Sequence, residues 1–331
     1  MRNIILAIES SCDETAFALI DENGEVIGDV VNSQAKIFEE IGGVVPEMAS
    51  RMHVENIMPL FKQLLKETNI TINDIKLIAT TYGPGLIGSL LVGTTFANSL
   101  SLMYDIPVLG INHMQAHMYS VYQNNNIKYP YLSLIISGGH TELVLAKDCF
   151  NFEIIGETQD DALGECYDKV ARLIGLGYPG GPKIEKLAQN GKNTYQLPNP
   201  LNDGSCNFSF SGLKSASLNL FNQAKMKNQE INKEDFACSF QSVVIDCLTT
   251  KLKQAIVLTN PKTISVVGGV SCNQFIKKEL LKINSNILFP EKYLATDNAI
   301  MVGKLAYLQM KNQKKEFLIP KPNLETETIW N

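Results

Sequence analysis

Short apolar strands alternate with helices along this chain, and the pattern starts twice with a strand, a polar turn and a second strand. The first start is Ile4–Ile8 and Ala16–Ile20, and the second is Tyr131–Ile136 and Thr141–Ala146. Helices and buried strands then follow in turn, including the strand Ile264–Val267. This alternation predicts an α/β chain whose sheets are covered on both faces. The two starts predict two related halves.

Length and composition narrow the class of protein. The 331 residues correspond to about two domains, and 45% hydrophobic with 19% charged residues excludes a disordered chain. No run of about 18 apolar residues and no signal peptide are present, so we expect no membrane span. The seven scattered cysteines form no C-x-x-C pair, which predicts a reduced, cytoplasmic protein.

The charge is unevenly distributed. The net charge of −5 argues weakly against a nucleic-acid binder, but residues 251–331 hold 12 lysines and 6 acids, a balance of +6. The first 250 residues carry the remaining 17 basic and 28 acidic residues, a balance of −11. The basic region is either a surface for a polyanion or a solvated lysine-rich face.

Histidine is scarce, and two of the four histidines form a pair. His113 and His117 stand at i and i+4, so a helix places both imidazoles on one face, as one divalent metal requires. The alternative is a pair of partly buried histidines without a ligand. The pair is not H-E-x-x-H, because Gln115 cannot serve as the base of a zinc protease. Asp297 is a candidate third ligand, although its place before a helix also suits an N-cap.

Glycine turns follow several predicted strands. Ser137-Gly138-Gly139-His140 joins two strands and either presents backbone N–H groups to a ligand or is an ordinary hairpin turn. Residues 83–88 fit G-x-G-x-x-G, with Asp105 20 residues after Gly85. However, Asp105 precedes the next strand, whereas a ribose-binding acid sits at that strand's carboxyl end. A dinucleotide-binding dehydrogenase is therefore disfavoured.

A larger set of motifs, in order, gives the chain a family resemblance. It resembles the universal tRNA threonylcarbamoyltransferases (TsaD/Gcp-like), members of the actin/Hsp70/sugar-kinase superfamily. The matching motifs are Ile8-Glu9-Ser10-Ser11-Cys12-Asp13-Glu14-Thr15, residues 42–51 (GGVVPEMASR), His113-x3-His117, Ser137-Gly138-Gly139-His140-Thr141, residues 161–169 (DALGECYDK), residues 178–182 (YPGGP), residues 210–214 (FSGLK), Gly268-Gly269-Val270-x2-Asn273 and Thr296-Asp297-Asn298-Ala299. The last 25 or so residues match no motif.

The resemblance implies a fold and a set of site residues. It implies two actin-like (ASKHA, ribonuclease H-like) α/β lobes with the active site in the cleft between them. The expected domains are residues 1–125, with inserted helices in 33–66, and residues 126–331. His113, His117 and Asp297 would bind one divalent metal, Fe²⁺ in preference to Zn²⁺. The threonylcarbamoyl-AMP donor would bind to Ile136, Ser137, Gly138, Gly139, His140, Asp168, Gly181, Glu185 and Asn273. Asp13, Glu14 and His140 are the candidate catalytic residues, and His53 is expected to be structural.

The resemblance also implies an activity. The family transfers a threonylcarbamoyl group to the exocyclic amine of the adenosine 3′ of the anticodon, in tRNAs reading codons that start with A. The expected partners are tRNA, a non-catalytic paralogous subunit (TsaB-like) and a small ATPase (TsaE-like). The alternatives are a nucleotide-dependent kinase or ATPase of the same superfamily, a metalloprotease and a non-catalytic scaffold.

Overall fold

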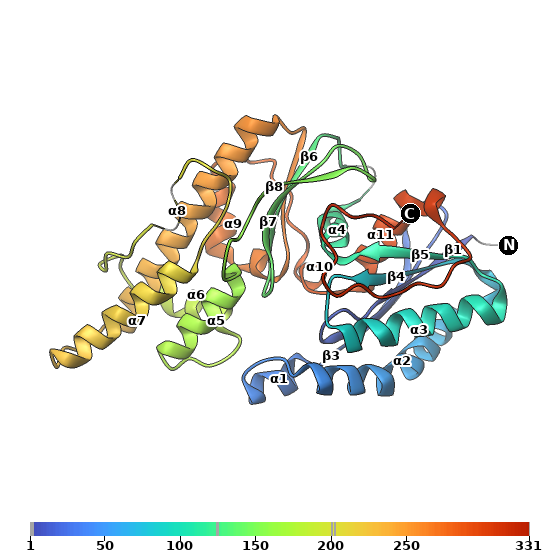
Figure 1. The fold of residues 1–331 in the computed structure, drawn as a ribbon, viewed down its shortest axis with the longest axis horizontal. Helices are drawn as coiled ribbons and strands as arrows, with labels where there is room; N and C mark the ends of the chain where they lie inside the picture. The colour runs from blue at the N-terminus through green and yellow to red at the C-terminus, as the bar shows by residue number, and fades with distance from the viewer. Residues whose placement is uncertain (1–2, 124–125, 200, 202, 331) are drawn as a thin grey trace. The chain divides into compact units, whose positions relative to one another are not determined.

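The computed structural model describes residues 3–123, 126–199, 201 and 203–330, which form two compact units (Figure 1). Unit 1 comprises Met1–Ile127, Lys147–Glu153 and Pro290–Asn331, and unit 2 comprises Lys128–Ala146 and Ile154–Phe289. The expected division put all of residues 126–331 in the second domain. Pro290–Asn331 instead belongs to unit 1, because its helix packs on the first sheet.

Unit 1 is built on a sheet in the order β3-β2-β1-β4-β5. The pairs β1–β2 and β2–β3 are antiparallel, and β1–β4 and β4–β5 are parallel. The carboxyl ends of β1, β4 and β5 therefore lie at one edge. The strands are β1 (Ile4–Glu9), β2 (Glu14–Ile20), β3 (Val26–Ser33), β4 (Ile75–Gly83) and β5 (Val108–Asn112).

Helices cover both faces of this sheet. On one face, Phe61 of α2 and Phe96 of α3 pack around Phe17, with ring centroids 5.3–5.7 Å apart. On the other face α11 lies so close to β1 and β2 that a Cβ at Gly303 would fall 2.4 Å from Ile20. The helices of unit 1 are α1 (Ala35–Ile41), α2 (Pro46–Thr68), α3 (Ile87–Tyr104), α4 (His113–Met118), α10 (Lys292–Ala295) and α11 (Ala299–Gln309), with short 3₁₀ turns η1 (Ile72–Asp74), η2 (Tyr119–Val121) and η4 (Met310–Asn312).

Unit 2 repeats the beginning of unit 1. Its sheet has the order β8-β7-β6-β9, in which β6 pairs antiparallel with β7 and parallel with β9. Strand β1 is paired in the same way with β2 and β4, so the two sheets share this arrangement. The elements are β6 (Tyr131–Ile136), β7 (Thr141–Ala146), β8 (Phe152–Glu157), α5 (Leu163–Leu173), α6 (Gly180–Ala188), α7 (Ser211–Met226), α8 (Lys233–Thr259), β9 (Thr263–Val267), η3 (Gly269–Cys272) and α9 (Gln274–Leu280). The predicted α/β class is confirmed.

Helix α2 contains a proline in its interior. The sequence predicts a break or kink at Pro59. The predicted break is wrong, because α2 continues as one helix from Pro46 to Thr68. Proline removes one backbone N–H, and the packing of Ile57, Leu60 and Phe61 on the sheet holds the helix through that position.

Among the described residues, no helix is long and apolar enough to cross a membrane.

Candidate functional site

Three possible metal ligands meet in unit 1. The Nε2 atom of His117 lies 3.2 Å from Nε2 of His113 and 3.0 Å from Oδ1 of Asp297. The Nε2 atom of His113 lies 3.5 Å from the same Asp297 oxygen. Both imidazoles are almost fully buried, and the ligand atoms of all three residues lie within 4.8 Å of one another.

This triangle has the dimensions of a metal-binding group. Ligand atoms about 2.0–2.2 Å from one tetrahedral ion are about 3.3–3.6 Å apart, close to the distances of 3.0, 3.2 and 3.5 Å in this triangle. Two imidazole nitrogens and a carboxylate oxygen lie within 3.5 Å of one another, and a cation or a shared proton would stabilise such a close group of acceptor atoms. The donor set therefore fits a divalent metal and leaves coordination positions open for a substrate.

Local structure explains how these residues come together. Helix α4 starts directly after β5, and Asn112 caps it by accepting hydrogen bonds from the backbone N–H groups of Met114 and Gln115. At α11 the cap is Asn298, whose Oδ1 accepts from the Met301 N–H. The N-cap alternative for Asp297 is therefore wrong, and its carboxylate is available to the two histidines.

Glu9, at the end of β1, is a site residue that the sequence analysis did not single out. Its side chain is fully buried and accepts three hydrogen bonds: from the Ser11 N–H (2.6 Å), from Thr81 Oγ1 (2.6 Å) and from His113 Nδ1 (3.0 Å). Because an ionised carboxylate only accepts, Nδ1 of His113 carries the proton and Nε2 is the free ligand atom. Glu9 ends β1, Thr81 lies near the carboxyl end of β4 and His113 directly follows β5. Polar residues at the carboxyl ends of neighbouring parallel strands are the signal that could have identified Glu9.

The charged groups of the site shift one another's pKa values. Burial disfavours the charged form of His113, but the carboxylates of Asp297 and Glu9 outweigh it and raise the pKa of His113 well above 6.5. Burial likewise opposes ionisation of both carboxyls. His113 nevertheless lowers the pKa of Glu9 and, with His117, that of Asp297. With both carboxylates ionised, the site without metal keeps a net negative charge even when His113 is protonated, as expected for a cation site.

The β1–β2 turn brings further carboxylates near Asp297. Burial, with the nearby charges of Asp297 and Asp13, raises the pKa of Glu14 well above its ordinary value. Ser33 Oγ donates to Glu14 Oε1 at 2.9 Å. His53 holds the same turn, since its Nδ1 lies 2.7 Å from Thr15 Oγ1 and its Nε2 lies 2.9 Å from the Cys12 carbonyl. These contacts agree with a structural role for His53.

In unit 2 the Ser137–His140 segment forms a tight turn between β6 and β7. The Ser137 N–H donates to the His140 carbonyl (2.9 Å), and the His140 N–H donates to Ser137 Oγ (3.1 Å). The turn rests on the start of α5, where a Cβ at Gly164 would fall 2.6 Å from the Ser137 carbonyl. A Cβ on Gly138 or Gly139 would meet no described atom within 4 Å, so the backbone of both glycines is accessible to a ligand.

The other expected donor-binding residues lie on helices linked to one another. Asp168 of α5 accepts from the Gly180 N–H at 2.6 Å, next to Gly181, and burial raises the pKa of Asp168. Glu185 of α6 accepts from the Gln274 N–H at 2.6 Å. Asn273 caps α9 through Oδ1 and donates to Gln241 Oε1 at 3.3 Å. The structure thus connects α5, α6 and α9 through these side chains.

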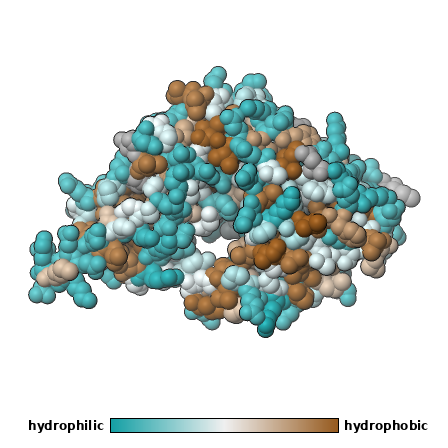
Figure 2. Space-filling view, in the orientation of Figure 1, coloured by the Kyte–Doolittle hydropathy of each residue, from teal (hydrophilic) through white to brown (hydrophobic). Residues whose placement is uncertain are grey.

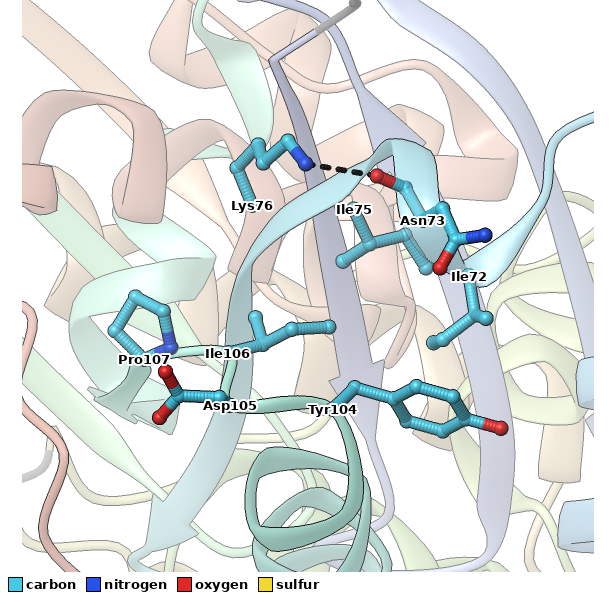
Figure 3. Close-up of a pocket in the computed structure, with 8 residues that line it drawn as sticks. All are labelled: Ile72, Asn73, Ile75, Lys76, Tyr104, Asp105, Ile106 and Pro107. Atoms are coloured by element: carbon cyan, nitrogen blue, oxygen red, sulfur yellow. Dashed lines mark hydrogen bonds between the residues drawn. The ribbon is translucent and has the colours of Figure 1, made fainter.

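A shallow pocket in unit 1 contains Asp105 (Figure 3). It measures about 170 Å³ and lies at the amino ends of β4 and β5, with Lys76 donating to the Asn73 carbonyl at 2.8 Å. His113 instead follows the carboxyl end of β5. Asp105 is the C-cap of α3 and precedes β5, so it does not occupy the position of a ribose-binding acid.

Solved structures define the class of fold. HypF of T. kodakarensis superposes with a TM-score of 0.65 at 14% identity, covering 96% of this chain; this chain spans 49% of the HypF chain. The activator of the 2-hydroxyisocaproyl-CoA dehydratase from Clostridium difficile superposes with a TM-score of 0.53 at 15% identity, covering 94% of this chain and 96% of the activator. At these identities the likeness establishes a shared two-lobed α/β fold and nothing about ligands.

Sequence similarity identifies the family. A profile of the TsaD family, tRNA N6-adenosine threonylcarbamoyltransferase, matches residues 25–304. A relative of that name from Clostridium beijerinckii is 47% identical over 98% of both chains, and one from Bacillus cereus is 48% identical over 93% of this chain and 92% of the relative. The chain belongs to the tRNA N6-adenosine threonylcarbamoyltransferase family. It is a transferase that acts on tRNA, which confirms the predicted family and enzyme class.

Proposed function

We propose that this chain transfers the threonylcarbamoyl group from threonylcarbamoyl-AMP to the exocyclic amine of the adenosine 3′ of the anticodon, in tRNAs reading codons that start with A. The observation that carries the proposal is the triangle of the buried His113 and His117 with the partly buried Asp297, in a member of this family. In the reaction the adenosine nitrogen forms a bond to the carbamoyl carbon. The bond from that carbon to the phosphate oxygen breaks, and AMP leaves with the electron pair.

The first requirement of this reaction is an activated donor and residues that bind it. An adenine amine is a poor nucleophile because its lone pair is delocalised into the ring, so the donor must be an activated mixed anhydride. Within the Ile136–His140 turn, the exposed backbone of Gly138 and Gly139 suits a phosphate or a developing negative charge. Asp168, Gly181, Glu185 and Asn273 are proposed to bind the rest of the adenylate.

His113, His117 and Asp297 are proposed to hold one divalent metal, Fe²⁺ in preference to Zn²⁺. Two histidines and one carboxylate with open positions suit Fe²⁺, and similar ligand sets bind Zn²⁺. When bound, the metal would orient the threonylcarbamoyl group and polarise its carbonyl. Anaerobic purification followed by elemental analysis tests the assignment, and protein that stays metal-free after incubation with either ion would contradict it.

The attacking amine must lose a proton, and Asp13, Glu14 and His140 are proposed for the catalytic acid–base work. Glu14 is favoured as the base, because burial and the neighbouring carboxylates raise the pKa of its carboxyl group and so make its carboxylate a stronger base than that of an ordinary glutamate. Replacement by glutamine should lower the rate of transfer at saturating donor while leaving metal content unchanged. A Glu14→Gln variant with the wild-type rate would remove Glu14 from this role.

Reconstitution tests the whole proposal. The purified chain, its partner proteins, an unmodified tRNA and threonylcarbamoyl-AMP should yield threonylcarbamoyladenosine in nucleoside mass spectrometry, together with AMP. Absence of product with partners that are active with a known family member would contradict it. Turnover of a γ-phosphate that survives loss of His117 would instead indicate the kinase or ATPase alternative.

We propose a non-catalytic paralogous subunit and a small ATPase as partners in the cytoplasm. Exposed apolar side chains on α1–α3 support the first partner, and Figure 2 shows brown residues gathered over this part of unit 1. They are Ile37, Ile41, Val54, Met58, Ile87 and Leu91. Because a paralogue shares the fold, it can present a similar helix face. Val54→Glu with Met58→Glu should abolish co-elution with this subunit, and unchanged co-elution would exclude the surface.

The lysines of residues 251–331 are proposed to bind tRNA. Two of these twelve lysines are not available to tRNA, because Lys251 and Lys304 are buried. They donate hydrogen bonds to the backbone carbonyls of Ser205 and Gly24, respectively. Lys278 and Lys311 are exposed. Their replacement by glutamate should weaken tRNA binding and reduce the slope of log K against log salt by about 0.7–0.9 per lost phosphate contact. Binding curves at several salt concentrations measure this slope. An unchanged slope would show that these lysines make no contact with the tRNA phosphates.

Metal affinity should depend on pH. In the metal-free protein the neighbouring carboxylates raise the pKa of His113 well above 6.5, so a proton competes with the metal for this site. Affinity should therefore rise with pH up to that pKa, by at most about tenfold per pH unit for each proton displaced, and then level off. Competition with a chelator between about pH 5.5 and 9 measures the effect. A flat profile would contradict ligation by His113.

A further inference from the structure

The C-terminal segment, for which the sequence offers no motif, lies against the helix that carries both histidines. We call residues 318–330 the C-terminal strap. Figure 1 shows this segment in red, running past β4, β5 and α4. All of these elements belong to unit 1.

Two buried amide side chains join the strap to α4. The Gln115 Nε2 group donates to the backbone carbonyls of Thr326 (2.7 Å) and Thr328 (3.1 Å). Asn112, the cap of α4, donates through Nδ2 to the carbonyls of Glu325 (2.9 Å) and Thr328 (3.2 Å). Both side chains are 1% exposed, so water cannot replace these acceptors without rearrangement.

The strap is itself firmly attached to the sheet. The Lys321 N–H donates to the Tyr82 carbonyl (2.7 Å), and the Gly85 N–H donates to the Pro322 carbonyl (3.1 Å). Leu318 and Leu324 are buried in the core of unit 1. The Thr328 N–H closes a turn onto the Glu325 carbonyl (3.0 Å), and this turn presents the acceptors used by Asn112 and Gln115.

Helix α4 needs such support because it has only six residues. An isolated helix of this length is unstable in water, so its position depends on tertiary contacts. Gln115 lies between His113 and His117 in the sequence, and the two hydrogen bonds of its amide anchor the helix to the strap. A rotation of α4 would move both Nε2 atoms away from Asp297.

We propose that the C-terminal strap fixes the orientation of α4, so that Gln115 and Asn112 are positioning residues for the His113–His117–Asp297 site. This inference rests on the proposed metal function of that site. It gives the last residues of the chain a role in the reaction, although they contribute no ligand and lie outside the motifs.

The test uses the full-length Gln115→Met variant, which removes the amide but keeps a side chain of similar length. Hydrogen exchange of the α4 amides is measured in the metal-free protein, and Fe²⁺ affinity is measured by anaerobic competition with a chelator. We expect faster exchange confined to α4 and the strap, and about 10- to 100-fold weaker Fe²⁺ binding. A second variant that ends at Leu324 removes all three carbonyl acceptors and should show the same pattern.

Two control variants separate positioning from general stability. Glu325→Ala changes an exposed side chain but keeps the backbone carbonyl, so exchange and affinity should match the wild type. Asn98→Ala breaks the bonds between Asn98 and Leu318 (3.0 and 2.9 Å), which hold the start of the strap before the Lys321 anchor. It should lower the melting temperature without changing α4 exchange or Fe²⁺ affinity.

The outcomes are distinct. Wild-type α4 exchange in both Gln115→Met and the shortened chain overturns the inference, whatever the metal does. An equal loss of affinity in Asn98→Ala also overturns it, because the effect would then be one of global stability. Failure of the wild-type protein to bind Fe²⁺ or Zn²⁺ would refute the proposed metal function, whereas the exchange result still decides whether the strap orients α4.

Discussion

His113→Ala and Asp297→Ala are each expected to release the bound metal and to lower threonylcarbamoyl transfer by about two to three orders of magnitude. A metal that polarises a reacting carbonyl contributes several kcal/mol, and about 1.4 kcal/mol corresponds to tenfold in rate. Each variant removes one corner of a triangle whose sides measure 3.0–3.5 Å, which leaves two protein ligands. Elemental analysis and the tRNA modification assay measure the two losses.

A buried histidine outside the triangle provides the matched control. His53 is as buried as His113 and His117, but its ring nitrogens face Thr15 Oγ1 and the Cys12 carbonyl instead of the triangle. His53→Gln should retain the wild-type metal content, even where loosening of the β1–β2 turn slows the reaction. Full metal occupancy in both His113→Ala and Asp297→Ala would refute the assigned ligands.

The second large effect is expected for Glu9→Gln, which should weaken Fe²⁺ binding by about 10- to 100-fold. The variant keeps the shape of the side chain but removes the charge that holds the Nδ1 proton of His113. Its amide nitrogen must also face one of three donors, so one hydrogen bond is lost inside the protein. Both effects reduce the basicity and the fixed orientation of His113. Competition with a chelator measures the affinity.

Thr81→Val is the control for this prediction. It removes one donor to Glu9 and leaves the contact between Glu9 and His113 intact. Its effect on Fe²⁺ affinity should therefore be smaller than that of Glu9→Gln. If Glu9→Gln binds Fe²⁺ as tightly as the wild type, or if Thr81→Val is equally impaired, Glu9 does not tune the metal site through His113.

Parts of the site could be read from spacing alone. The i, i+4 pair His113 and His117 requires only a helix to share one face, and the glycine turn at residues 137–140 requires only two flanking strands. Asp297 could be offered only as a candidate, because an aspartate before a helix is also an ordinary cap. The structure removes that alternative by placing Asn298 at the cap of α11.

Other parts depended on which elements are neighbours. Glu9 and His113 are 104 residues apart, and they meet because β1, β4 and β5 are adjacent parallel strands. The C-terminal strap meets Gln115 across more than 200 residues through backbone carbonyls, which carry no sequence signal at all. The assignment of Pro290–Asn331 to unit 1 has the same origin.

By itself, the amino-acid sequence determined the α/β class, the paired starts, the histidine pair and the family, because periodicity, spacing and ordered motifs are local properties. Only the tertiary structure decided that Asp297 completes a triangle, that Glu9 holds the proton of His113 and that the C-terminal strap supports α4. These are contacts between segments far apart in the chain, and their geometry follows from strand order and packing, which no single stretch of sequence encodes.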